Sequence, residues 1–209
     1  MKSAAILLED GTTIPAQSIG YDEITIGEIV FNTSMTGYQE IITDPSYDRQ
    51  IITFTNPHIG NTGINLDDYE SSTHGCSGII IRNYPTIGSS WRNEHKFIEF
   101  LKDKSISAVC SVDTRYLTSL LRNKGSLSGC IVPDIKNLDK AKTLLSEFSG
   151  LNGLDLAKNV TTNKEYIWNE GTHDLIDIKS SKDQKRLKVF AYDYGIKKNI
   201  LRILNDLGC

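Results

Sequence analysis

The chain has 209 residues and a formal net charge of −3; 39% of the residues are hydrophobic and 23% are charged. That length suits one or two domains, and the apolar fraction is large enough to build a core. No run approaches the ~20 apolar residues of a membrane span, and no basic stripe stands out, so the sequence argues against a membrane protein and against a nucleic-acid partner.

We expect residues 1–150 to form one mixed α/β domain. Asp10-Gly11 is a strong hairpin signal between two β-rich segments. Apolar runs and alternating patterns predict strands at 4–8, 13–18, 25–31, 50–55, 78–82, 106–112 and 128–132.

Helical periodicity begins in the second half of this domain. Asn93 can cap a helix, and the inner face of that helix would carry Phe97, Ile98 and Leu101. Several strands therefore come first, and helices alternate with strands later, which predicts a β-rich half packed on a small α/β half. Two further helices are expected, one from Asp113 to Gly125 and one at 138–148.

The last sixty residues differ in character. Residues 151–187 lack periodicity and end in the polar stretch SSKDQKRLK, so we expect an irregular connector. Residues 188–209 predict a strand at 188–192, a turn and an amphipathic helix. A strand followed at once by a helix is the opening unit of a parallel α/β sheet, whose strands need neighbours. We therefore expect a truncated domain, with 188–209 disordered, docked on the first domain or paired with a second copy.

The cysteines indicate reduced, mostly buried thiols. Cys76, Cys110, Cys130 and Cys209 form neither a C-x-x-C pair nor a disulfide-dense pattern, which is typical of a cytoplasmic protein. His74 lies two residues from Cys76, but the other histidines are scattered singly, so we expect no metal site. Cys209 follows a helix end, and we expect a small apolar residue there, not a nucleophile.

The polar segment 36–47 is the most informative candidate for a site. Asp44-Pro45 favours a type I turn that places Ser46 at its tip, just before a buried strand. From this local pattern alone, the favoured interpretation is that Ser46 caps a backbone group. The chain contains no G-x-x-x-x-G-K-[ST], G-x-S-x-G or H-E-x-x-H motif, so the motifs indicate no catalytic centre.

Several long segments of the chain resemble one family, the small subunit of glutamine-hydrolysing carbamoyl-phosphate synthase. The resemblance runs in order along essentially the whole chain. The segments that carry it are FNTSMTGYQEIITDPSYDRQIITFTNPHIGN, VDTRYLTSLLRNKGSLSGCI, GLNGLDLAKNVTT and VFAYDYGIKKNILRILNDLGC.

The resemblance implies a fold and a reaction. Residues 1–150 would form the family's swivelling β/β/α amino-terminal domain, 151–187 a connector, and 188–209 the first strand and helix of a class I glutamine amidotransferase domain, a doubly wound α/β fold. In the family, a Cys-His-Glu triad hydrolyses glutamine. The ammonia reaches the large subunit, where bicarbonate and two ATP, with Mg, yield carbamoyl phosphate for arginine and pyrimidine biosynthesis.

The resemblance also assigns a role to Ser46, which matches a family serine that reaches the bound glutamine. The triad lies beyond Cys209 in the family pattern, so we expect no catalytic residue in this chain and no glutamine hydrolysis by the chain alone. Acyl transfer needs a thiolate, a base and oxyanion donors, and Ser46 offers binding contacts only. An alternative is a non-catalytic docking module for the large subunit; a stand-alone small-molecule binder is a weaker possibility.

Overall fold

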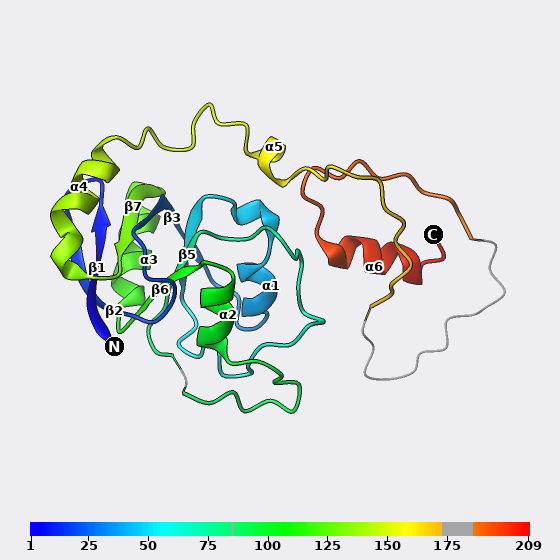
Figure 1. Ribbon diagram of the computed structural model, residues 1–209, viewed down its shortest axis with the longest axis horizontal. Helices are drawn as coiled ribbons and strands as arrows, with labels where there is room; N and C mark the ends of the chain where they lie inside the picture. Colours follow the sequence, from blue (N-terminus) through cyan, green and yellow to red (C-terminus); the bar gives the residue numbers. More distant parts are fainter. Residues whose placement is uncertain (85, 173–185) are drawn as a thin grey trace.

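A computed structural model describes residues 1–84, 86–172 and 186–209 (Figure 1). Within these residues, seven strands form a closed barrel with mixed parallel and antiparallel pairing, so the fold is mixed α/β. The strands are β1 (Lys2–Leu8), β2 (Thr13–Ser18), β3 (Thr25–Asn32), β4 (Gln50–Phe54), β5 (Gly78–Ile80), β6 (Ser107–Cys110) and β7 (Leu127–Val132).

The strands close in the order β1-β2-β6-β5-β4-β3-β7. The predicted hairpin is confirmed, because β1 and β2 pair antiparallel on either side of Asp10-Gly11. Strands β3, β4, β5 and β6 run parallel to one another, and β7 closes the barrel by antiparallel pairing with β1 and β3. All seven predicted strands in residues 1–150 are present in the described structure.

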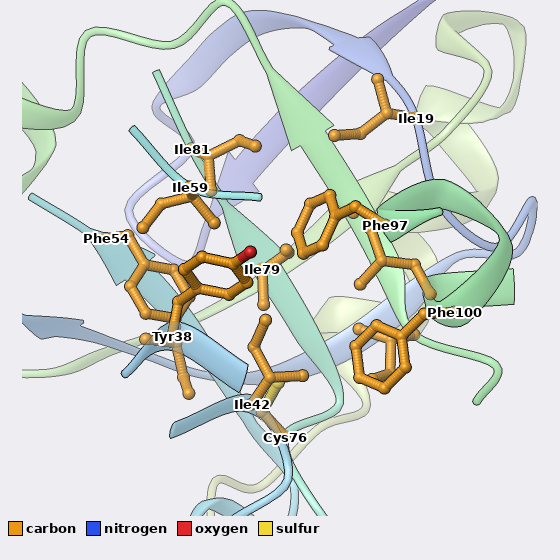
Figure 2. Packing of buried hydrophobic residues seen from close by; sticks show 14 of the residues in the cluster. Ile19, Tyr38, Ile42, Phe54, Ile59, Cys76, Ile79, Ile81, Phe97 and Phe100 are labelled. Atoms are coloured by element: carbon orange, nitrogen blue, oxygen red, sulfur yellow. The ribbon is translucent and has the colours of Figure 1, made fainter. Parts of the chain in front are cut away.

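Side-chain alternation along the parallel strands divides the core into two parts. Ile51 and Ile80 face the barrel interior, whereas Ile52 and Ile79 face outward, and all four are fully buried. Both faces of β4 and β5 are therefore covered, which explains why their buried residues are consecutive instead of alternating. The outward cluster packs under α1 (Tyr38–Ile42) and α2 (Phe97–Asp103), as Figure 2 shows.

Two longer helices cover the remaining faces. Helix α3 (Thr114–Lys124) places Leu117 and Leu121 against the interior cluster, and α4 (Leu138–Ser146) covers β1 and β7. The predicted start and end of α3 are confirmed: the Asp113 side chain accepts a hydrogen bond from the Tyr116 N–H at 3.0 Å, and Gly125 is the C-cap at φ 90°.

The predicted cap of the preceding helix is wrong. Helix α2 begins at Phe97 with Lys96 as its N-cap, and its buried face contains Phe100 where the sequence suggested Ile98. The Asn93 side chain instead accepts a hydrogen bond from the Ile64 N–H at 3.3 Å. A contact with a distant loop has therefore taken the capping group that the local pattern assigned to the helix.

The end of the chain confirms one prediction and contradicts another. Helix α6 (Lys198–Asp206) is present and docks on the first part of the chain through Leu201 and Arg202, both buried. The predicted strand at 188–192 is wrong: the segment is extended but exposed, and it pairs with no strand in the described ranges. A strand requires backbone partners, and none of the described residues supplies them here.

The connector contains more structure than the sequence predicted. A short helix, α5 (Leu156–Val160), is capped by the Asp155 side chain, which accepts a hydrogen bond from the Lys158 N–H at 3.2 Å. Part of the predicted connector, residues 173–185, lies outside the described residues. No helix in the described part of the chain is both long and apolar enough to cross a bilayer.

Candidate functional site

Ser46 lies at the tip of a tight turn, as the sequence predicted. The turn is a 3₁₀ helix, η1 (Pro45–Tyr47), and the buried Asp44 caps it by accepting a hydrogen bond from the Ser46 N–H at 2.9 Å. The Ser46 side chain is exposed, and its hydroxyl has no hydrogen-bond partner among the described residues. The interpretation that Ser46 itself caps a backbone group is therefore wrong, because Asp44 makes that contact and leaves the hydroxyl available.

The end of the chain reaches this turn. Lys197, the N-cap residue of α6, forms an ion pair with Asp44, with 2.6 Å between its Nζ and the Asp44 Oδ2. The hydrogen bond to Asp44 raises the pKa of Lys197 above its ordinary value. Asp44 thus holds the Ser46 N–H with one carboxylate oxygen and the lysine ammonium with the other, so Ser46 and the start of α6 are joined through one buried carboxylate.

A second turn positions Lys197. The Asp193 Oδ1 accepts hydrogen bonds from the Gly195 and Ile196 N–H groups at 2.9 and 2.8 Å, and Gly195 takes a left-handed φ of 96°. The Tyr166 hydroxyl donates to the Asp193 Oδ2 at 2.6 Å. Burial alone would raise the pKa of Asp193, but these hydrogen bonds lower it. The Asp193 carboxylate therefore fixes the chain just before α6.

A hollow lies between these two turns and the connector. It is lined by Pro45 beside Ser46, by the 70–74 loop, by connector residues 160–164, Tyr166 and Trp168, and by the start of α6. Polar groups at its wall include His74, Lys164 and Lys198. Its position makes it the candidate place for a small polar ligand that contacts the Ser46 turn.

The described thiols do not form a nucleophilic centre. Cys76, Cys110 and Cys130 are free and buried; burial raises the pKa of Cys76 to about 12 and that of Cys130 to about 11. At neutral pH these two side chains are protonated thiols, which are poor nucleophiles. Cys209 is half-buried and free. Within the described ranges, no thiol is hydrogen-bonded to a histidine and no metal-binding cluster of histidine, cysteine or acidic side chains occurs.

Residues 6–131 match the family described as carbamoyl-phosphate synthase small chain, CPSase domain. The match covers more than half of the chain. The chain belongs to this family. The resemblance inferred from the quoted segments is thereby confirmed.

Curated relatives extend the similarity to the whole chain. The carbamoyl phosphate synthase small chains of Vibrio parahaemolyticus and Photobacterium profundum are each 51% identical over 213 residues, and that of Pectobacterium atrosepticum is 50% identical over 217. Each alignment covers 100% of this chain but only 56%, 55% and 56% of these relatives, in the same order. The chain thus spans about half the length of the curated relatives it matches.

Among solved structures, an aminopeptidase from Aneurinibacillus sp. strain AM-1 aligns with 63% of this chain and 30% of its own length. The TM-score is 0.35 at 16% sequence identity, a likeness too weak to support any conclusion.

Sequence reasoning found Ser46 but missed the groups around it. Asp44 carried a local signal, because an aspartate before proline is a common cap for a turn. Lys197 carried none, since it acts on a segment far away in the chain. Only the folded structure brings the Lys197 ammonium to the Ser46 turn.

Proposed function

We propose that this chain is the glutamine-binding part of a carbamoyl phosphate synthase small subunit, and that Ser46 contacts the glutamine. The proposal is supported by the family membership and by one structural observation: an exposed serine hydroxyl without a partner among the described residues, held on a buried cap. A surface hydroxyl that is fixed in position but not used by its own fold is suited to bind a ligand.

The chemistry of glutamine fits this site. Its α-carboxylate and α-ammonium groups are charged, and a serine hydroxyl can donate to the first or accept from the second. Hydrogen bonds to charged groups are roughly twice as strong as neutral ones. Because Asp44 fixes the Ser46 backbone, little conformational freedom is lost when the hydroxyl engages the ligand.

Hydrolysis needs groups that Ser46 does not provide. An activated thiolate, a base and donors for the tetrahedral oxyanion each lower the barrier of acyl transfer. The high pKa values of Cys76 and Cys130 argue against either thiol as the nucleophile. We propose that the complete small subunit hydrolyses glutamine with a Cys-His-Glu triad of the class I amidotransferase type, and that residues 1–209 alone do not.

The organisation proposed for the full enzyme follows the family. Residues 1–150 act as the swivelling β/β/α domain, 151–187 as the connector, and 188–209 as the opening strand-helix unit of the amidotransferase domain; the 188–192 strand would form when neighbouring strands are present. The partner is a large subunit that binds ATP and Mg and makes carbamoyl phosphate from ammonia and bicarbonate. The product would serve arginine and pyrimidine biosynthesis in the cytoplasm, a compartment consistent with free thiols.

A docking role for the first domain is the second candidate function. Met35, Ile87 and Trp91 are large apolar side chains that are at least 74% exposed, which favours contact with a partner surface. Co-purification with the large subunit tests this role: if the first domain docks, residues 1–150 retain the large subunit on an affinity column. A large subunit that passes into the flow-through would contradict this role.

The Ser46 contact is tested by steady-state kinetics. In a small chain of the relatives' full length, bound to its large subunit, we expect Ser46→Ala to raise the KM for glutamine about tenfold, the loss typical of one charge-assisted hydrogen bond. Activity with free ammonia should stay unchanged, because ammonia bypasses the glutamine site. Ser149→Ala, at an exposed serine after α4, is the matched control. An unchanged KM for Ser46→Ala would rule out the contact.

A further inference from the structure

Helix α6 begins without a side-chain cap of its own. Its N-cap residue, Lys197, makes no side-chain hydrogen bond to the helix. The first N–H groups of a helix have no partner within it and require one from elsewhere. Here the Lys198 N–H donates to the Glu70 carbonyl oxygen at 3.1 Å, and the Asn199 N–H donates to the Glu70 carboxylate at 3.0 Å. A residue 129 positions away from Asn199 in the chain therefore caps α6.

Glu70 is well placed to act in this way. Its side chain is buried, so its carboxylate is shielded from water and directed at the helix end. A negative charge at a helix N-terminus is favoured by the helix dipole as well as by the hydrogen bonds. The Glu70 N–H in turn donates to the Thr43 hydroxyl at 3.0 Å, next to Asp44 in the chain. One residue thus joins α6 to the segment that carries the Ser46 turn.

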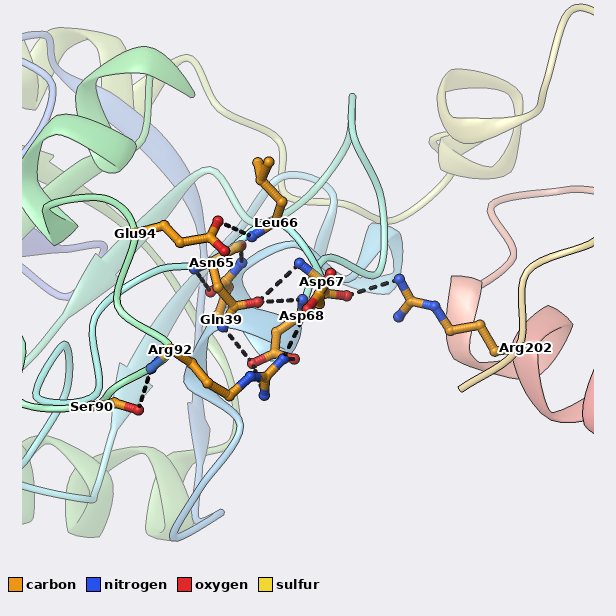
Figure 3. Close-up of polar contacts among 9 residues, drawn as sticks. All are labelled: Gln39, Asn65, Leu66, Asp67, Asp68, Ser90, Arg92, Glu94 and Arg202. Atoms are coloured by element: carbon orange, nitrogen blue, oxygen red, sulfur yellow. Dashed lines mark hydrogen bonds and ion pairs between the residues drawn. The ribbon is translucent and has the colours of Figure 1, made fainter. Parts of the chain in front are cut away.

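The loop that presents Glu70, residues 65–70, is held rigidly. Gln39 and Asn65 exchange two hydrogen bonds, from the Gln39 Nε2 to the Asn65 carbonyl at 2.6 Å and from the Asn65 N–H to the Gln39 Oε1 at 3.1 Å. Arg92 donates two hydrogen bonds to the Asp68 carboxylate, from Nη1 to Oδ2 at 3.1 Å and from Nη2 to Oδ1 at 2.9 Å (Figure 3). These contacts fix Asn65 and Asp68, and Thr43 fixes Glu70, so the loop presents its acceptors to α6 from fixed positions.

A second contact sets the rotation of α6 about its axis. One turn after the capped end, the buried Arg202 donates from its Nη2 to the Asp67 carbonyl oxygen at 2.8 Å (Figure 3). Two contacts with the same loop, at Glu70 and at Asp67, fix both the axial position and the orientation of the helix. Lys197, directly before α6, is therefore held where its ammonium meets Asp44.

We propose that Glu70 is a positioning residue for the glutamine site: by capping α6 from the first domain, it holds Lys197 on Asp44 and so sets the Ser46 turn against the amidotransferase segment. This inference rests on the proposed function. It assigns Glu70 no contact with glutamine. Loss of the cap would free α6, separate Lys197 from Asp44 and weaken glutamine binding, while the hydrolytic step itself would be left intact.

The structural part is tested on the 209-residue chain by hydrogen exchange. We expect Glu70→Ala to speed the exchange of the Asn199 amide at least about fivefold, because its acceptor is lost. Glu70→Gln keeps an oxygen acceptor and should stay near the wild-type rate. Glu99→Ala removes an exposed glutamate on α2 and serves as the control. Equal rates at Asn199 in the wild type and Glu70→Ala would overturn the capping role.

The functional part uses the full-length small chain in complex with its large subunit. We expect Glu70→Ala to raise the KM for glutamine about fivefold or more, with kcat nearly unchanged. The KM of Glu70→Gln should stay close to the wild-type value. The rate of ammonia-dependent synthesis should be the same in all three proteins. A general folding defect would instead lower kcat and the ammonia-dependent rate together. If Glu70→Ala does not fold, Glu70→Asp takes its place, because it keeps the charge but shortens the reach by one methylene, and we expect the same rise in KM.

The two possible failures are distinguishable. A wild-type complex that releases no ammonia from glutamine would refute the proposed function. A wild-type complex that is active, with the same KM in Glu70→Ala or Glu70→Asp, would refute the positioning role of Glu70 and leave the proposed function standing.

Discussion

Replacing Asp44 with asparagine separates the two tasks that its carboxylate performs. Asparagine keeps an oxygen that can accept the hydrogen bond from the Ser46 N–H, so the cap of the turn survives. The ion pair to Lys197 is lost, because the amide carries no charge. Asp44→Asn therefore weakens the link between the Ser46 turn and α6 and leaves the local turn intact.

The size of the effect follows from burial and exposure. The Asp44 side chain is only 7% exposed, but the Lys197 side chain is 43% exposed, so water screens the pair in part. Hydrogen bonds to charged groups contribute about 1.5–3 kcal/mol, and allowance for solvent screening reduces the value here to about 1 kcal/mol. Asp44→Ala also removes the turn cap and should cost about 1 kcal/mol more.

Urea-induced unfolding at pH 7 measures these losses, and a double-mutant cycle with Lys197→Met isolates the pair. We expect a coupling energy of about 1 kcal/mol between Asp44→Asn and Lys197→Met, reduced in high salt. Strictly additive losses in low salt would show that the ion pair does not hold α6 on the first domain, and the link between Ser46 and α6 would have to be abandoned.

Two further predictions concern the acid stability of the chain and the reactivity of its thiols. The hydrogen bond from Lys124 lowers the pKa of Asp10 from 3.8 to about 2, so the stability that Asp10 contributes is complete above pH 3.8 and is lost as the pH falls through about 2. Asp10→Asn should therefore flatten the acid dependence of the urea midpoint below pH 4; an unchanged acid profile would contradict this. Iodoacetamide at pH 8 should label Cys209 well before Cys76 and Cys130, because burial raises the pKa values of these two thiols to about 12 and about 11. Labelling is followed by mass spectrometry, and a result in which Cys76 is labelled first would contradict its burial.

The barrel was predictable because its signals are local. In the run QIITF, apolar residues stand at consecutive positions instead of alternating ones, which is expected for a parallel strand covered on both faces, and β4 is such a strand. The caps of α3 were equally readable, since Asp113 and Gly125 stand next to the helix they bound. Helix α1, at five residues, is too short to show a helical period in the sequence.

The errors arose where distant segments decide the structure. Asn93 has the right chemistry for a helix cap, but the backbone of Ile64 uses its side chain. Residues 188–192 have the composition of a strand, yet a strand depends on neighbours that the described residues do not supply. Propensity identifies what a segment favours, and tertiary contacts decide whether the segment adopts it.

The candidate site divides in the same way. The turn at Ser46 followed from Asp44-Pro45, and the resemblance raised Ser46 from a capping residue to a ligand contact. The roles of Glu70 and Lys197 depend on contacts across more than a hundred residues, which no local pattern encodes. Sequence reasoning therefore located the residue proposed to touch glutamine and missed the residues that hold it in place.

The contact between Ser46 and glutamine is tested most directly by a structure of the full-length small chain with glutamine bound. We expect the Ser46 Oγ to lie within about 3.2 Å of the α-carboxylate or α-ammonium group of the ligand, with Lys197 still paired to Asp44. Glutamine bound at a place remote from the Ser46 turn, with the hydroxyl facing only solvent, would contradict it.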